Sequence, residues 1–119
     1  MRNNKLGRLY RDGEIVINKG DEGSCLFVIQ EGKVEVFDEN GGGEVKIADL
    51  GSGEFFGEMG LFEKDVRSCT VRASGNAKIL TIDKKNFYKT IQKDPTLAYR
   101  LLQKMSSRLR ELNKKVTQV

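Results

Sequence analysis

Short segments in which apolar and polar residues alternate fill the first two-thirds of the chain, up to Ile82. Valine, isoleucine, phenylalanine and threonine recur in them with the two-residue period of a β-strand. Glycine-rich and polar segments at 18–23, 30–32 and 38–43 separate them, and we interpret these as turns or hairpin loops. The pattern predicts strands at Glu14–Ile17, Cys25–Gln30, Lys33–Phe37, Glu44–Leu50, Cys69–Ala73 and Lys78–Ile82.

After Ile82 the apolar residues follow a helical period. Asp83 is a typical helix cap, and the helix that it predicts over 83–93 buries Phe87 and Ile91. Asp94 followed by Pro95 is a second start signal, with aspartate as the cap and proline at the first helical position. We therefore expect a second helix over residues 94–119.

The second predicted helix carries an apolar seam in which the intervals of three and four residues alternate. A helix this long at the end of a small domain has little of its own domain to pack against. We therefore favour a parallel homodimer through the seam, and packing of the seam back onto the strands stays open as the alternative. The seam residues are Leu102, Met105, Leu109, Leu112, Val116 and Val119.

The length of 119 residues corresponds to one domain with a core of its own. The strands occupy residues 1–82, the short helix 83–93 and the long helix 94–119, so the fold class is mostly β with C-terminal α. Evenly spaced short strands are typical of a sandwich or a barrel.

Composition excludes several classes of chemistry. The chain has no histidine, which removes histidine-dependent catalytic pairs and histidine metal sites. Cys25 and Cys69 are too few for a zinc site or a disulfide framework, so we expect free thiols in a reducing compartment. No apolar run approaches the ~20 residues of a membrane span and no signal peptide is recognisable, which favours the cytoplasm. We expect no enzyme, no metal and no cofactor.

Charge adds little to this picture. The 21 basic and 17 acidic residues give a net charge of +4, and the basic residues crowd the C-terminal third. Such a surface can contact nucleic acid or an acidic partner, but lysine and arginine there alternate with apolar positions. We therefore interpret it as the solvated side of the helices.

The segment 53–62 and the segment 67–71 together carry the candidate chemistry. Glycines surround the carboxylate of Glu58, and the guanidinium of Arg67 follows a short apolar turn. Arginine presents paired donors that fit two phosphate oxygens, whereas a carboxylate accepts from a hydroxyl group. These groups suit a ligand with both a phosphate and a sugar hydroxyl, although a surface ion pair between Arg67 and an acidic neighbour is the alternative.

The run Phe-Gly-Glu-Met-Gly-Leu-Phe at 56–62, followed by Arg-Ser-Cys-Thr-Val at 67–71, resembles the phosphate-binding cassette of the cyclic nucleotide-binding domain family. That family includes the bacterial catabolite activator protein, to which the likeness is greatest. The segments 12–17, 20–23, 26–29 and 32–36 are similar to the family's early hairpins in the same order. The resemblance covers roughly residues 9 to 118.

The resemblance implies a jelly-roll-like β-roll over 1–82, with a cassette at 53–69. It implies a cyclic nucleotide as ligand, cAMP rather than cGMP, and a long final helix that dimerises and closes over the nucleotide. The phosphate would be held by Arg67, by the hydroxyl of Ser68 and by backbone N–H groups of Gly57, Glu58 and Met59, while the Glu58 carboxylate would accept from the ribose.

The resemblance also implies a wall and a lid for the base. Val36 and Ile47 correspond to the inner wall, although either can equally be ordinary core. Where the catabolite activator protein has a threonine-serine pair, this chain has Leu112 and Asn113, and Asn113 can bond either adenine or guanine. The spacer between Glu58 and Arg67 is also one residue shorter, so the choice of base is less certain than the phosphate and ribose contacts.

We therefore expect a bacterial cyclic-nucleotide sensor whose C-terminal helix moves when the ligand binds. The alternative is a β-roll homodimer that acts as a protein-interaction module and keeps only a vestigial nucleotide site. Many bacterial relatives continue into a DNA-reading domain after this helix. Because this sequence ends at Val119, we expect no direct DNA binding by the chain itself.

Overall fold

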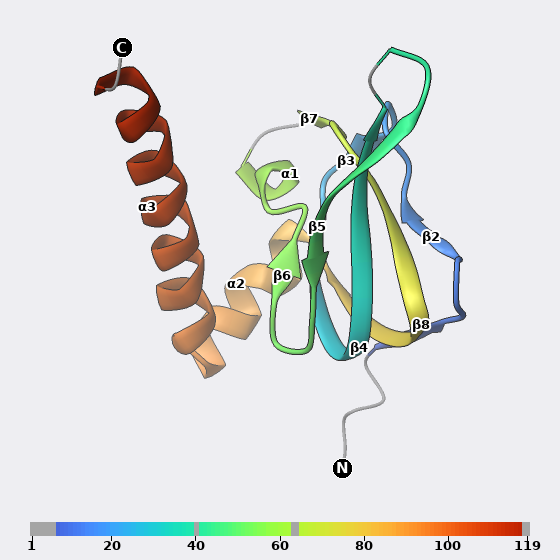
Figure 1. Cartoon of the computed structure of the whole chain (residues 1–119). Helices are drawn as coiled ribbons and strands as arrows, with labels where there is room; N and C mark the ends of the chain where they lie inside the picture. Colours follow the sequence, from blue (N-terminus) through green and yellow to red (C-terminus); the bar gives the residue numbers. More distant parts are fainter. Residues whose placement is uncertain (1–6, 40, 63–64, 118–119) are drawn as a thin grey trace. The chain divides into compact units, whose positions relative to one another are not determined.

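The structure is a computed structural model that describes residues 7–39, 41–62 and 65–117. It contains two compact units, Met1–Lys84 and Lys85–Val119. The first holds all the strands and one short helix, and the second holds helix α3 and nearly all of α2 (Figure 1). The elements are β1 (Arg8–Tyr10), β2 (Ile15–Ile17), β3 (Glu22–Gly23), β4 (Leu26–Glu39), β5 (Glu44–Leu50), β6 (Phe55–Phe56), α1 (Met59–Phe62), β7 (Asp65–Val66), β8 (Thr70–Ile82), α2 (Lys84–Lys93) and α3 (Thr96–Thr117).

The predicted class, mostly β followed by C-terminal helices, is confirmed. The strands form an antiparallel sheet in the order β1-β8-β4-β5, with β2 paired to β8 and β6 paired to β4. Strands β3 and β7 form a separate two-stranded sheet. No helix within residues 7–39, 41–62 and 65–117 is long and apolar enough to cross a membrane.

Two long strands, β4 and β8, are the frame of the first unit. They pair from Leu26↔Ile82 to Phe37↔Thr70. Their inward positions supply most of the core, because alternate residues of a strand point to the same face. Val34 and Ile79 are fully buried there, together with Leu26 and Ile29. Tyr10 and Ile17 on β1 and β2 and Phe56 on β6 complete the central cluster.

The predicted turn at 30–32 is wrong, because β4 runs through it without a break. The register of β4 against β8 shifts between Ile29 and Glu31 and again between Glu31 and Lys33. Gly32 has φ +88°, and a Cβ there would collide with the carbonyl oxygen of Asn76. The glycine therefore marks a bulge, which bends a strand without ending it.

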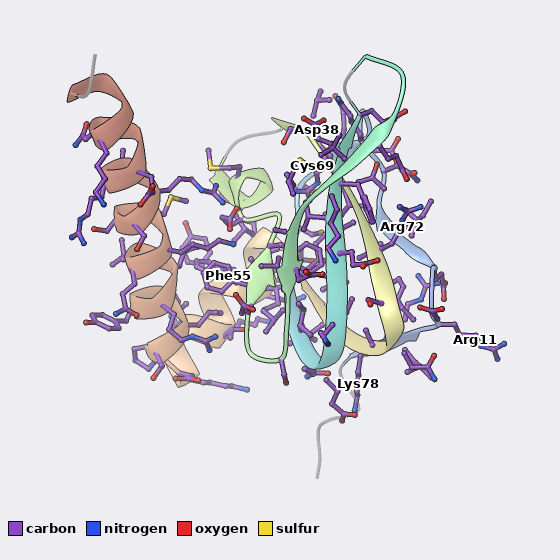
Figure 2. All side chains as sticks on the ribbon, viewed as in Figure 1. Arg11, Asp38, Phe55, Cys69, Arg72 and Lys78 are labelled. Atoms are coloured by element: carbon purple, nitrogen blue, oxygen red, sulfur yellow. The ribbon has the colours of Figure 1, made fainter. Side chains whose placement is uncertain are left out.

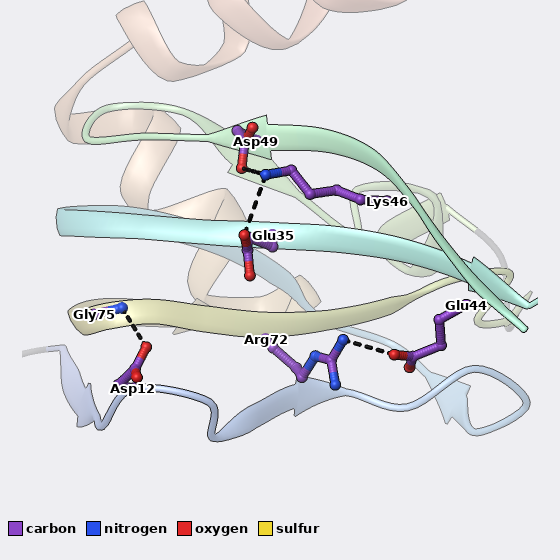
Figure 3. Close-up of polar contacts among 7 residues, drawn as sticks. All are labelled: Asp12, Glu35, Glu44, Lys46, Asp49, Arg72 and Gly75. Carbon is purple, nitrogen blue, oxygen red and sulfur yellow. Dashed lines mark hydrogen bonds and ion pairs between the residues drawn. The ribbon is translucent and has the colours of Figure 1, made fainter.

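Polar contacts cross the strands on the other side of this frame (Figure 3). Lys46 on β5 bridges Glu35 on β4 at 3.2 Å and Asp49 on its own strand at 3.0 Å, and these carboxylates raise the pKa of Lys46. Arg72 on β8 pairs with Glu44 at 2.8 Å, and its guanidinium lies 4.0 Å from the ring centroid of Phe37. These side chains are exposed or half-buried, so the pairs contribute little to the stability of the sheet.

We expect Gly32→Ala to lower the free energy of unfolding by about 2 kcal/mol or more, because alanine is strained at positive φ and its methyl group would meet backbone. Urea unfolding followed by circular dichroism measures the change. Gly43→Ala is the matched control, since a Cβ at Gly43 meets nothing within 4 Å. Equal midpoints for the two variants would contradict the bulge.

Candidate functional site

The guanidinium of Arg67 is the buried charge around which the candidate site is built. Arg67 lies between β7 and β8 and is 9% exposed, so it is not a surface ion pair. Its Nη1 donates to the carbonyl oxygen of Gly57 at 2.9 Å, and its Nη2 donates to that of Cys25 at 2.8 Å. A buried cation requires such acceptors. A guanidinium carries five N–H donors, more than these two carbonyls use.

Two glycines make room for this side chain. A Cβ on Gly23 would overlap Nε and Cζ of Arg67, and a Cβ on Gly57 would lie 2.9 Å from its Nη1. Gly57 also has φ +76°, which glycine adopts without strain. The face of the guanidinium lies toward Phe27, with Cζ 5.7 Å from the ring centroid, and Phe27 stacks on Phe56 at 5.2 Å.

Backbone contacts hold the segment 20–23 beside Arg67. The Arg67 N–H donates to the carbonyl of Asp21 at 2.8 Å, and the Gly20 N–H donates to the carbonyl of Arg67 at 2.9 Å. Glu22 and Gly23 pair with Val66 and Asp65 to form the β3–β7 sheet. Each of these bonds joins a turn near the start of the chain to the cassette more than 40 residues later.

Lys19 ties the same turn to the main sheet. Its backbone N–H donates to Oγ1 of Thr70 at 3.1 Å, and its Nζ donates to Oδ1 of Asp38 at 2.9 Å. That hydrogen bond raises the pKa of Lys19 and lowers the pKa of Asp38. Figure 2 shows Asp38 and Cys69 at one end of the sheet, in agreement with the Phe37↔Thr70 register. These two hydrogen bonds of Lys19 therefore lie where β4 ends and β8 begins, and the start of β8 is close to Arg67 in the sequence.

A cavity of about 260 Å³ opens next to the guanidinium. Residues 16–18, residues 21–25, Phe27 and Arg67 line it. The lining combines the apolar side chains of Val16 and Phe27 with the polar residues Asn18, Asp21, Glu22 and Ser24 and with the cation of Arg67. The cavity can therefore receive a small anion-bearing molecule that also has an apolar part.

Glu58 lies one residue after the glycine that accepts from Arg67. It is 5% exposed and precedes α1, whose first turn closes through Gly60 N–H to Gly57 O at 3.3 Å and Leu61 N–H to Glu58 O at 3.1 Å. Met59, the first residue of α1, is 38% exposed. The structure thus brings Gly57 into contact with Arg67 and places Glu58 and Met59 directly after it, whereas none of these three residues lines the cavity.

The other predicted contacts lie elsewhere. Ser68 is exposed between β7 and β8, next to Arg67. Val36 is half-buried against the central cluster. Ile47 is 54% exposed and has no register partner on β4, because the register shifts there from Val36↔Ala48 to Phe37↔Lys46. Neither lines the cavity beside Arg67. Asn113 is exposed on α3, in the second unit.

Three residues of the site were missed by the sequence analysis. Gly23, Cys25 and Phe27 contact the guanidinium, but their segment is predicted only as a turn and a strand. Glycine at the end of the 18–23 turn is the available signal, because a turn glycine can mark a close approach as well as a bend. Nothing in the sequence indicates that the carbonyl of Cys25 would accept from an arginine 42 residues later.

Metal chemistry has no support within the described part of the chain. No group of three or more histidine, cysteine, aspartate or glutamate side chains gathers there in a way that can hold an ion. Cys25 and Cys69 are both free thiols and half-buried. The donors at the site are instead those that bind an anion and a hydroxyl group.

Comparison with known proteins agrees with this geometry. The family model described as the cyclic nucleotide-binding domain matches residues 7–94. The chain is 35% identical over 105 residues to the cyclic AMP receptor protein of Thermus thermophilus. The aligned region covers 87% of this chain and 49% of that protein. It is 40% identical over 79 residues to the cAMP-dependent protein kinase regulatory subunit of Schizosaccharomyces pombe, covering 66% of this chain and 18% of that one.

A solved structure shows the same fold. The catabolite activator protein of Thermus thermophilus aligns with a TM-score of 0.81 at 33% identity, over 92% of this chain and 52% of that chain. The sequence thus spans about half the length of its bacterial relatives.

We expect Gly23→Ala to lower the free energy of unfolding by about 1–3 kcal/mol. The new methyl group would displace the guanidinium of Arg67 from its two carbonyl acceptors and leave a buried charge with fewer partners. Thermal unfolding measures the loss. Gly43→Ala again controls for the added methyl group, and a Gly23→Ala midpoint equal to that of the control would mean that the guanidinium does not lie against Gly23.

Proposed function

The chain belongs to the cyclic nucleotide-binding domain family, and from this premise we propose that it is a cAMP sensor domain. The observation that carries the proposal is the buried Arg67 guanidinium, which is fixed beside a cavity and has more donors than its carbonyl partners use. A cyclic phosphate has one negative charge and two exposed oxygens, which suit the paired N–H donors of the guanidinium. We propose cAMP over cGMP because the relatives described above are named for cAMP.

The ligand contacts are proposed residue by residue. Arg67 and the hydroxyl of Ser68 donate to the phosphate, and the N–H groups of Gly57, Glu58 and Met59 face it at the start of α1. The Glu58 carboxylate accepts from the ribose 2′ hydroxyl, a charge-assisted bond that a 2′-deoxy ligand cannot make and without which it binds more weakly. Such a site binds its ligand and has no group placed for catalysis.

Base contacts come from residues outside the Arg67 cavity. Ile47 presents an apolar side chain that is 54% exposed on β5 at the register shift, and Val36 is half-buried on the neighbouring strand β4. Asn113 supplies an amide that can bond the base edge once α3 closes. The base would therefore extend from the cavity toward β5.

The output of the sensor is proposed to pass through α3. Leu102 and Leu109 are 67% and 62% exposed and seven residues apart on one helical stripe, which suits a parallel homodimer. Leu112 and Val116 continue the stripe, although the structure does not describe their side chains, and Val119 lies outside the described residues. Ligand binding can move α3 only through contacts that differ between the two states. We propose that the dimer acts in the cytoplasm.

The first test is a thermal-shift titration with cAMP and cGMP. Ligand at 100 times its dissociation constant adds about 2.7 kcal/mol of stability, which is a shift of roughly 10 °C in a domain of this size. We expect that shift with cAMP, a smaller one with cGMP, and none in Arg67→Ala measured against its own ligand-free midpoint.

Arg72→Ala is the matched control, because Arg72 belongs to the ion pairs on the other side of the frame. It is expected to keep the full shift. If neither nucleotide shifts the unmodified chain, the sensor is excluded and the interaction module with a vestigial site takes its place.

The ribose contact is tested with an isosteric change. We expect Glu58→Gln to weaken cAMP binding by about 10-fold to 100-fold, the loss of one charge-assisted hydrogen bond. Binding of 2′-deoxy-cAMP, which lacks the hydroxyl group, should change little. Isothermal titration calorimetry with both ligands measures this difference, and equal losses for the two nucleotides would remove Glu58 from the ribose.

A further inference from the structure

Positive charge is concentrated in the second unit of the chain. Lys85–Val119 contains nine lysine or arginine residues and two acidic ones, a net charge of +7. Met1–Lys84 contains twelve basic and fifteen acidic residues, a net charge of −3. The modest charge of the whole chain therefore conceals two units of opposite sign, and the second has the composition of a polyanion-binding segment.

Within this unit, α2 carries its lysines in a single row. Lys85, Lys89 and Lys93 follow one another at intervals of four residues, and all three are exposed. Residues so spaced lie on one helix face, about 6 Å apart along the axis. The row therefore extends about 12 Å along the helix and is inclined by about 26° to the helix axis.

Helix stability does not explain this row. Lysines four residues apart repel each other, and α2 contains no acidic residue that would offset the repulsion. Lys84 and Lys85 also occupy the first turn, where the helix dipole favours acidic side chains. Only Lys93, in the last turn, is placed favourably with respect to the dipole. The charges therefore weaken the isolated helix, and an external anionic surface would reverse that effect.

A tyrosine borders the row. Tyr88 is 57% exposed and lies three residues after Lys85, so it borders the N-terminal end of the row, while Lys93 lies farther round the helix. Tyrosine has an apolar ring with a polar tip and gathers at the boundary between lipid and water. The row itself contains no arginine, the residue that most often reads base edges. A plane of lipid phosphates requires only point charges and an interfacial aromatic ring.

We propose that the lysine row of α2, residues 85, 89 and 93 with Tyr88 at its border, docks on an anionic phospholipid surface. The cytoplasmic leaflet is the anionic one, and it attracts clustered lysines on helices that do not cross it. The helix axis would lie parallel to the membrane, with the Tyr88 ring at the level of the headgroups. The row shares no residue with the proposed nucleotide contacts, so we expect the chain to dock whether or not its ligand is bound.

The test is cosedimentation of the whole chain with vesicles of phosphatidylcholine, with or without phosphatidylserine, in 50 mM salt. We expect binding only to the vesicles that contain phosphatidylserine, and loss of that binding in 0.5 M salt. The triple variant Lys85→Gln, Lys89→Gln and Lys93→Gln should bind about 100-fold more weakly, since each lysine near the surface contributes about a fivefold factor.

A second triple variant separates the row from net charge alone. Arg11→Gln, Lys33→Gln and Lys46→Gln remove the same charge from exposed positions in the first unit, where Arg11 projects away from the strands (Figure 2). It should bind the vesicles within about threefold of the unmodified chain. Equal losses in both triple variants would overturn the proposal, as would tighter binding of a 30-base-pair DNA duplex than of the vesicles in the same buffer.

Position 88 gives a direct readout of contact. The chain contains no tryptophan, so Tyr88→Trp introduces a single tryptophan that can be excited selectively beside the two remaining tyrosines. Its emission should shift to the blue on phosphatidylserine vesicles as the ring leaves water. Leu9→Trp, at a position 61% exposed in the first unit, should not shift. Equal shifts at both positions, or none at position 88, would contradict docking through α2.

Discussion

A buried guanidinium is the constraint on which the cassette depends. Arg67 cannot leave water unless acceptors replace it, and the chain supplies the carbonyls of Gly57 and Cys25 from opposite sides. Those carbonyls can approach only because Gly23 and Gly57 have no side chain in the way. The β3–β7 pairing then holds the turn at 20–23 against the same arginine. The site is therefore a set of backbone segments ordered by one side chain.

The strands β4 and β8 place these segments. Cys25 stands just before β4, and Arg67 stands just before β8. Antiparallel pairing sets the starts of the two strands at opposite ends of their ladder, which runs from Leu26↔Ile82 to Phe37↔Thr70. The register shifts between Ile29 and Lys33, with Gly32 in the bulge, bend β4 without ending it. We infer that this bend lets the Cys25 carbonyl reach the guanidinium of Arg67, which it meets at 2.8 Å.

The sequence predicted the class of fold and the helices because their signals are local. Alternation marks a strand and an aspartate-proline pair marks a helix start, whatever the rest of the chain does. The turn at 30–32 was mispredicted because glycine serves equally in a turn and in a bulge, and only the partner strand decides between them. Arg67 was recognised from its motif, whereas Gly23 and Cys25 were not. Their contacts with Arg67 join residues that lie 42 or more positions apart in the sequence, and no local pattern of residues indicates such contacts.

The confinement of the Arg67 side chain has a consequence for the entropy of association. A free arginine side chain carries about 2 kcal/mol of rotamer entropy, and binding an anion with a mobile arginine removes much of it at the moment of contact. Here the two carbonyls and the flanking glycine positions have already confined the side chain during folding. In the proposed site an incoming anion would meet donors in a fixed orientation, and the ordering of that side chain would belong to the folding equilibrium rather than to recognition.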